Sequence, residues 1–330
     1  MNMLVDGEWR TDVDPTAGED GSFQRQETSF RNRIEDDSGT RFPPEPGRYH
    51  LYVSYACPWA HRTLITRKLL DLEDAITVSV VDPFRGEDGW QFTPEKEGCT
   101  RDHVHGADYL RELYVRAAPD ATGRVTVPVL WDTQENTIVN NESREIMRML
   151  NTEMAHLGDG NATVLPSDLV DDVDRILDEI YEPINNGVYR AGFATDQEPY
   201  DEAVDDLFAA LDRWDGVLAD RRYLAGERLT EADVAMFTTL VRFDEVYHTH
   251  FMCNVRRITD YEHLWPYLRD LYQTSGVAET VRMDHVKEHY YTTHPGVNPH
   301  RIVARGPDPD FGAPHQRDRL AEGGPLAAAE

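Results

Sequence analysis

The alternation of apolar and polar positions divides the chain into two parts with different periods. In the first part, residues 49–53 form a short β-prone run, and residues 58–72 carry apolar side chains every three to four positions, as one buried helix face does. The later elements of this part are predicted in the order strand 76–81, strand 125–131, strand 137–139 and helix 141–150. The pattern is therefore a βαβ unit, a polar stretch and a ββα unit.

Two features of the first part refine this prediction. The polar stretch 82–124 is long for a connection and has room for a helix of its own. Pro128 stands near the head of an apolar strand, where it cannot donate to a ladder. It is therefore expected at a strand start or a tight bend, and it is a candidate for a cis peptide bond.

The second part has a helical period throughout. Apolar stripes predict helices over 170–184 and 204–218. A third helix is predicted to begin at Thr230, because Thr230 and Asp233 have the spacing of a capping box. Shorter helices are predicted near 264–272 and 275–289, and no internal repeat is found.

Polar segments rich in glycine and proline set the expected boundaries. Residues 1–47 are predicted to be an irregular arm, 151–167 a linker and 305–330 a loose acidic tail. Two domains are expected between these segments, an α/β domain over 48–150 and an all-helical domain over 168–304.

The charge narrows the range of partners. The chain carries 33 basic and 61 acidic residues, for a net charge of −28, and lysine occurs only at 68, 96 and 287. Nucleic acid and anionic membranes would be repelled, so neither is expected as a partner. The acidic residues are spread along the whole chain, which is typical of a halophilic surface that works in concentrated salt. No apolar run long enough for a membrane span and no secretory signal is found, so the cytoplasm is the expected location.

The chain has three cysteines, Cys57, Cys99 and Cys253, and no C-x-x-C pair. An odd number without such a pair argues against a disulfide framework and favours a reducing compartment. Cys99 and Cys253 do not stand at predicted helix starts, so both are interpreted as structural.

Cys57 stands where the first strand gives way to the first helix, with Pro58 suited to the first helical position. Unpaired N–H groups and the helix dipole favour a thiolate there, and at such sites thiol pKa values fall from ~8.5 to roughly 3.5–7.5. The alternative is a small buried side chain without reactivity. Because no second cysteine lies three residues on, a mixed disulfide at Cys57 would need an external thiol to resolve it.

The stretch His285–His289 fits the H-x-x-E-H pattern of some zinc peptidases, with two histidines one helical turn apart. No further ligand follows at helical spacing, so the alternative of a solvated or packed helix face is favoured and no metal site is predicted.

Five short motifs, in this order along the chain, carry a family resemblance. They are Cys-Pro-Trp-Ala-His-Arg at 57–62, Thr-Val-Pro-Val-Leu-Trp-Asp at 126–132, Asn-Asn-Glu-Ser at 140–143, Asn-Asn-Gly-Val-Tyr-Arg-Ala-Gly-Phe-Ala at 185–194 and His-Tyr-Tyr at 289–291. Together they resemble the glutathionyl-hydroquinone reductases, the Xi class of glutathione transferases, over roughly residues 1–305. The resemblance implies an α/β thioredoxin-like N-terminal domain, an all-α glutathione-transferase C-terminal domain and a homodimer.

The resemblance also implies residue roles. Cys57 would be the nucleophile, and Tyr189 and Tyr290 would line the quinol pocket, where phenol O–H groups hydrogen-bond ring oxygens. The residues that match thiol-contacting positions are Trp90, Arg124, Val127, Glu142 and Ser143. Val127 would pair its backbone with the cysteinyl part of the thiol.

Glu142 and Ser143 would hold the γ-glutamyl end of the thiol. A helix N-terminus with a hydroxyl suits a carboxylate, and Glu142 suits an ammonium. The implied reaction removes the thiol from a thiol-conjugated hydroquinone, with glutathione or γ-glutamylcysteine as cosubstrate and no bound cofactor. If the acidic surface marks a salt-loving host, γ-glutamylcysteine becomes the candidate thiol, because the Glu142–Ser143 pair reads only the γ-glutamyl end.

Two other functions remain open. An omega-type thioltransferase or dehydroascorbate-reductase-like enzyme would need Cys57 but not the tyrosines. A thiol-binding regulatory protein on the same fold would need no chemistry, since fold alone does not confer activity. Retention of Cys57 together with Tyr189 and Tyr290 favours the reductase.

Overall fold

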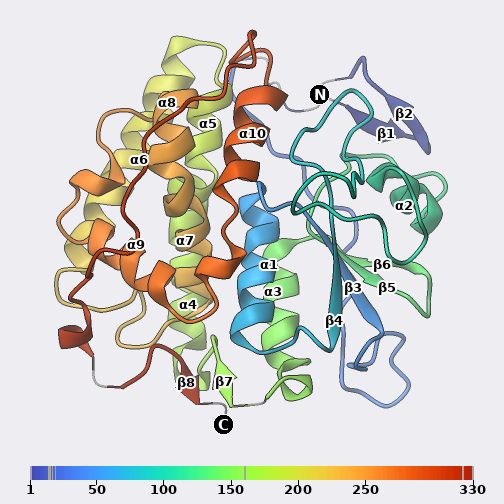
Figure 1. Ribbon diagram of the computed structural model, residues 1–330, viewed down its shortest axis with the longest axis horizontal. Coiled ribbons are helices and arrows are strands. Elements are labelled where there is room, and N and C mark those ends of the chain that lie inside the picture. The colour runs from blue at the N-terminus through green and yellow to red at the C-terminus, as the bar shows by residue number, and fades with distance from the viewer. Residues whose placement is uncertain are drawn as a thin grey trace. The chain divides into compact units, whose positions relative to one another are not determined.

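The computed structural model describes residues 2–13, 16, 18, 20–159, 161–321 and 323–328. The chain forms two compact units. Unit 1 comprises residues 1–16 and 25–160, and unit 2 comprises residues 17–24 and 161–330. Unit 1 is α/β, and the regular structure of unit 2 is helical apart from two short strands (Figure 1). None of the helices in the described part of the chain has the length and apolar character that a bilayer span requires.

The centre of unit 1 is a mixed four-stranded sheet in the order β4-β3-β5-β6. Its strands are β3 (Tyr49–Val53), β4 (Ile76–Val80), β5 (Val129–Asp132) and β6 (Thr137–Asn140). Strand β3 pairs parallel with β4 and antiparallel with β5, and β5 pairs antiparallel with β6. A parallel pair needs a crossover, and helix α1 (Pro58–Leu69) supplies it.

Helices cover the sheet of unit 1. Helix α1 packs beside α3 (Ser143–Thr152), and α2 (Leu110–Ala117) lies on the other side of the sheet (Figure 1). All residues of β3 are buried, as expected for a strand covered on both faces. The remaining elements of unit 1 are β1 (Met3–Val5), β2 (Glu8–Arg10) and the short helix η1 (Ala155–Leu157).

The structure confirms the order of elements predicted for the first part, and it shifts the bounds of several of them by one to four residues. The strand predicted over 125–131 begins only at Val129, so its predicted start was wrong. The peptide between Val127 and Pro128 is cis, as the proline suggested, and the chain bends there before the ladder begins. The polar stretch 82–124 does contain a helix, α2.

Unit 2 is a helical assembly built around α7. Its main helices are α4 (Val170–Ile180), α5 (Gly187–Phe193), α6 (Gln197–Val217), α7 (Glu231–Arg242), α8 (His248–His250), α9 (Leu264–Gln273) and α10 (Met283–Thr293). The shorter elements are β7 (Ala162–Thr163), η2 (Ser167–Leu169), η3 (Tyr181–Asn185), η4 (Phe243–Tyr247), η5 (Ile258–Asp260), η6 (Ala278–Thr280), η7 (Asp318–Leu320) and β8 (Ala327–Ala328). Every residue of α7 is buried, whereas α4 and α6 each bury one face.

The capping box predicted at the start of α7 is confirmed. The Asp233 carboxylate accepts hydrogen bonds from the backbone N–H and hydroxyl of Thr230, at 2.8 and 2.9 Å. It also accepts from the Leu224 N–H and the Tyr267 hydroxyl, both at 2.8 Å. Four donors satisfy a carboxylate that is wholly buried, so Asp233 is accounted for as a structural residue.

Part of the predicted C-terminal tail, 305–330, makes defined contacts within unit 2. Arg317 is 3% exposed, and its guanidinium donates to the backbone oxygens of Leu218 and Arg222. The ring of Phe311 stacks on Tyr272 with 4.8 Å between centroids. These contacts hold residues 311–317 against the helices of unit 2.

Candidate active site

The structure places Cys57 at the N-cap of α1, with extended backbone angles and Pro58 at the first helical position. The side chain is partly buried, and its Sγ lies 3.4 Å from the Val127 carbonyl oxygen. The Cys57 carbonyl accepts the first helical hydrogen bond, from the N–H of His61 at 2.9 Å. The sulfur therefore lies at the positive end of a helix, beside the bend that precedes β5.

Val127 presents an open main-chain donor beside this sulfur. Its carbonyl accepts from Cys57, but its N–H donates to no residue in the described part of the chain. The residue is 4% exposed, and a buried N–H without an acceptor is uncommon in proteins. The extended backbone of a bound thiol peptide can supply the missing acceptor.

Helix α3 presents a second open donor at its first residue. Glu142 is the N-cap, and its carboxylate accepts the Arg144 N–H at 3.3 Å. Ser143 is buried, with its Oγ 3.5 Å from a Glu142 oxygen, and its N–H has no acceptor among the described residues. An N–H, a hydroxyl and a carboxylate thus converge where the helix dipole favours an anion.

Trp90 and Arg124 lie elsewhere in unit 1. Trp90 is buried in the hydrophobic core against which Cys57 also packs, and its carbonyl accepts the Leu110 N–H at the start of α2. Arg124 is partly buried and follows Gly123, whose backbone pairs with Leu4 of β1. Their contacts with a thiol stay predictions.

The two predicted tyrosines are brought together in unit 2. Tyr189 on α5 and Tyr290 on α10 share a hydrogen bond between their hydroxyls. A third hydroxyl, that of Tyr247 on η4, lies 3.0 Å from the Tyr290 hydroxyl. The ring of Phe251 stacks on Tyr247 with 5.7 Å between centroids. We call Tyr189, Tyr247 and Tyr290 the tyrosine cluster.

Tyr247 was missed by sequence reasoning. It lies in none of the five motifs, and its local sequence looks like any buried aromatic stretch. Only the packing of η4 against α10 reveals that its hydroxyl joins the other two.

Burial sets the protonation of the tyrosine cluster. It raises the pKa of Tyr247 and of Tyr290 well above the ordinary value, against a smaller opposing influence of the Arg242 guanidinium. Both phenols are therefore protonated at neutral pH. The cluster can donate O–H hydrogen bonds to an oxygen that gains negative charge, without itself carrying charge.

The other two cysteines occupy apolar surroundings. Cys253 is fully buried, and burial raises the pKa of its thiol, which disfavours the reactive thiolate. Cys99 is also buried, with its Sγ 3.7 Å from the Val81 carbonyl oxygen. Both positions agree with structural roles.

The H-x-x-E-H stretch falls on α10. His285 and His289 are buried, and the His289 ring packs edge-on against Tyr290 with 5.2 Å between centroids. Across the described ranges, no group of three or more His, Cys, Asp or Glu side chains is arranged to hold a metal ion.

Family models match both units. The glutathione S-transferase N-terminal domain matches residues 56–153, and the glutathione S-transferase C-terminal domain matches residues 197–272. The chain belongs to the glutathione transferase family, and its relatives place it in the Xi class.

Among its relatives, YqjG of Escherichia coli, a glutathionyl-hydroquinone reductase, is 49% identical over 96% of this chain and 99% of its own. The glutathione-bound structure of YqjG has a TM-score of 0.87, with 48% identity over 96% of this chain and 99% of that one. A Xi-class glutathione transferase from Natrialba magadii has a TM-score of 0.93 and 74% identity, covering 97% of this chain and 98% of that one.

Proposed function

We propose that this protein is a glutathionyl-hydroquinone reductase that removes a γ-glutamyl thiol from thiol-conjugated hydroquinones. The observation that carries the proposal is the Cys57 sulfur at the start of α1, next to the open N–H of Val127. The relatives named above, one of them a glutathionyl-hydroquinone reductase, support the substrate class.

The first step is attack of the Cys57 thiolate on the thioether sulfur of the conjugate. The conjugate reacts as its keto tautomer, in which the ring carbon that bears the sulfur has already taken up a proton. A bond forms between the two sulfurs while the bond from sulfur to that carbon breaks, and its electron pair passes through the ring onto the carbonyl oxygen. That oxygen takes up a proton, and free hydroquinone leaves. The two sulfurs are oxidised to a disulfide, and the ring is reduced.

The tyrosine cluster supports this step. As the carbon–sulfur bond breaks, negative charge develops on the ring oxygen that receives the electron pair. The hydroxyls of Tyr189 and Tyr290 can hydrogen-bond that oxygen and stabilise the charge.

The second step regenerates the enzyme. A second thiol molecule, as its thiolate, attacks the outer sulfur of the mixed disulfide, releases the oxidised thiol and restores the Cys57 thiolate. The other two cysteines of the chain are buried at other positions, so an external thiol has to perform this step.

The physiological thiol is proposed to be γ-glutamylcysteine. The groups gathered at the start of α3, Glu142 and Ser143, are suited to an amino-acid end and would not contact a terminal glycine. Comparison of kcat/KM for γ-glutamylcysteine and glutathione tests this choice. A strong preference for glutathione would exclude it.

The decisive assay incubates the protein with a glutathionyl-hydroquinone and excess thiol. Free hydroquinone and oxidised thiol should appear in equal amounts, and omission of excess thiol should leave a Cys57 mixed disulfide visible in the intact mass. A protein that binds the conjugate but releases no hydroquinone would instead be a thiol-binding regulator.

The same proposal includes a homodimer in the cytoplasm, with a surface adapted to concentrated salt. The net charge of −28 makes the folded chain repel itself at low ionic strength. Sedimentation over a range of KCl concentrations tests both the dimer and its dependence on salt.

A further inference from the structure

The N-terminal hairpin of unit 1 is separate from the four-stranded sheet. Its strands β1 and β2 pair antiparallel, with Leu4 opposite Trp9. The two residues between the strands, Asp6 and Gly7, have positive φ angles of 49° and 79°, as an Asp-Gly type I′ turn requires. Two strands alone are only marginally stable in water, so the place of this hairpin depends on the segments against which it packs.

The first of these segments leads directly to Arg124. The Leu4 N–H donates to the Gly123 carbonyl oxygen at 2.9 Å, and the Gly123 N–H donates back to the Leu4 carbonyl oxygen at 3.0 Å. At the hairpin turn, the Gly7 N–H donates to the Ala121 carbonyl oxygen at 3.0 Å. The backbone just before Arg124 is therefore paired with β1.

The second segment is the turn that precedes Trp90. The Trp9 indole N–H donates to the Glu87 carbonyl oxygen at 2.8 Å, and the Asn2 side-chain amide donates to the Gly86 carbonyl oxygen at 3.3 Å. The hairpin thus connects two segments that lie far apart in the sequence, and each of them leads to a residue that matches a thiol-contacting position.

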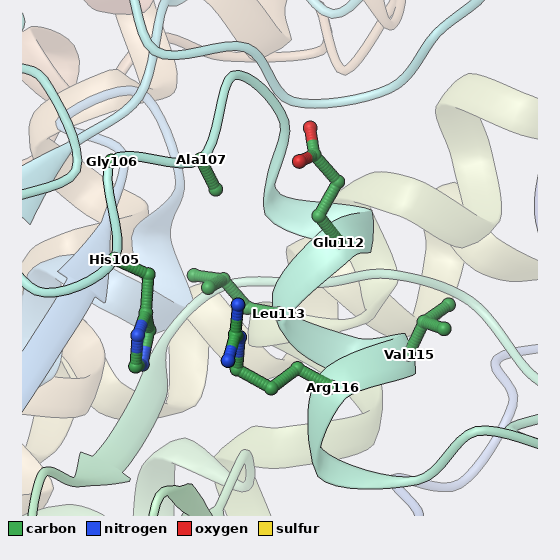
Figure 2. A pocket seen from close by; sticks show the side chains of 7 residues that line it. All are labelled: His105, Gly106, Ala107, Glu112, Leu113, Val115 and Arg116. Carbon is green, nitrogen blue, oxygen red and sulfur yellow. The ribbon is translucent and has the colours of Figure 1, made fainter.

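Trp90 has further anchors that do not involve the hairpin. It is 6% exposed within the core, and its carbonyl oxygen accepts the Leu110 N–H at 2.9 Å, at the start of α2. Figure 2 shows Glu112 on the first turn of this helix, where its carboxylate accepts the Tyr109 N–H at 2.8 Å. Displacement of the hairpin should therefore move Arg124 more than Trp90.

Gly7 is the residue through which the hairpin turn contacts the first segment most closely. A Cβ atom at this position would overlap the Pro119 carbonyl oxygen, so a side chain there would push the turn away from the segment. Gly39 has a similar φ angle of 87°, but no atom of the described residues lies within 4 Å of its Cβ position. Gly39→Ala therefore carries a similar backbone strain without the overlap, and it is the matched control for Gly7→Ala.

We propose that the N-terminal hairpin is a positioning element of the thiol site, which places Arg124 for contact with the bound thiol. The inference rests on the thiol-binding part of the proposed function. An arginine binds a carboxylate through parallel N–H groups, so the strength of that contact depends on where the backbone places the guanidinium. Leu4 and Gly7 act through Arg124 and not on the thiol itself.

Calorimetric titration of the full chain with glutathione and, separately, with γ-glutamylcysteine tests the inference. For the thiol that binds more tightly, Arg124→Gln should raise the dissociation constant about tenfold, and Gly7→Ala should raise it about fivefold. Gly39→Ala should leave the dissociation constant unchanged, although both glycine variants should lower the melting temperature.

A double-mutant cycle separates positioning from a general loss of stability. In the Arg124→Gln background, Gly7→Ala should have no further effect on the dissociation constant, because the group that it displaces is absent. Thr122→Val is a milder second variant, which removes the hydroxyl that accepts the Asp6 N–H at 2.9 Å. It should raise the dissociation constant about twofold, and only while Arg124 is present.

Three results would overturn the inference. They are an unchanged dissociation constant in Gly7→Ala and Thr122→Val, the same fold-change with and without Arg124, and an unaltered protein that binds neither thiol. The titration needs no conjugate and no turnover. A protein that shows the expected cycle but releases no hydroquinone would therefore refute the proposed reaction and leave this inference intact.

Discussion

The surroundings of Cys57 in unit 1 and the tyrosine cluster in unit 2 are formed by different kinds of chemical groups. Around Cys57, most of the polar groups that a ligand could contact belong to the main chain. They are the N-terminus of α1, the Val127 carbonyl and N–H, and the first N–H of α3. In the tyrosine cluster, side chains from α5, η4 and α10 meet through their hydroxyls. The position of Cys57 at a helix start would favour a charged sulfur, whereas burial keeps the phenols of Tyr247 and Tyr290 neutral.

This contrast shows which groups would carry out the chemistry in each place: main-chain groups around Cys57 and side-chain hydroxyls in the tyrosine cluster. A main-chain site tolerates changes in most of its side chains, because its donors are N–H groups that every residue except proline carries. A side-chain cluster depends on each hydroxyl in it. Substitutions of Cys57, of the tyrosine cluster and of Ser143 should therefore lower activity to very different extents.

Cys57→Ser should abolish the reaction, by about 10³-fold or more in kcat/KM, because it removes the only proposed nucleophile. Release of free hydroquinone from the conjugate is the measurement. Cys99→Ser is the matched control and should remain active, since Cys99 is buried beside the Val81 carbonyl oxygen and not at a helix start. Near-normal turnover by Cys57→Ser would show that the sulfur is not the nucleophile.

Replacement of both Tyr189 and Tyr290 by Phe should lower hydroquinone release by about 10²-fold, since donors to the developing oxyanion are lost. Disulfide exchange by Cys57 should survive in the same variant, measured with a mixed disulfide as substrate. Tyr223→Phe is the control, because its buried hydroxyl has no partner among the described residues. If both activities fell together, an omega-type thioltransferase would explain the data better.

Tyr247→Phe should have a smaller effect, about tenfold on kcat, because Tyr247 acts through its hydrogen bond to Tyr290. KM for the conjugate should change little, which separates a positioning role from a binding role. A large rise in KM with unchanged kcat would instead indicate direct contact with the substrate.

Ser143→Ala should raise KM for the thiol about fivefold, since one hydroxyl donor to the γ-glutamyl end disappears while the N–H remains. The value of kcat at saturating thiol should be preserved. Single-turnover release of hydroquinone, which needs no free thiol, provides the internal control and should be unaffected.

The smallest effect concerns stability in alkali. Burial raises the pKa of Tyr247 and Tyr290, so the folded chain keeps phenolic protons that the unfolded chain loses above pH ~10. The free energy of unfolding should therefore fall as pH rises from ~9 to ~10.5, by up to about 1 kcal/mol per phenol. Urea unfolding of the Tyr247→Phe/Tyr290→Phe variant should show a shallower decline.

The surroundings of Cys57 were more predictable from the sequence than the tyrosine cluster. A cysteine before a proline at the end of a β-prone run marks a helix start, and a proline within an apolar run marks a bend. Both signals are local, and both were confirmed as structure. These signals did not reveal where β5 begins. The apolar pattern starts at residue 125, but the bend before β5 keeps residues 125–128 out of the sheet.

The tyrosine cluster was only partly predictable. Tyr189 and Tyr290 were identified through the family motifs, because buried tyrosines have no periodicity of their own. Tyr247 lies on a π-helical turn after α7. Its hydroxyl meets that of Tyr290, which is 43 residues further along the chain, so only the packing of distant segments determines its place in the cluster.

The open N–H groups of Val127 and Ser143 have a consequence beyond catalysis. A thiol bound as proposed, between the entry to β5 and the start of α3, would connect these two elements of unit 1, and its site would exist only in the folded chain. At a hundred times its dissociation constant such a ligand adds about 2.7 kcal/mol to the free energy of unfolding. Resistance of the protein to proteolysis should then rise and fall with the supply of thiol around it.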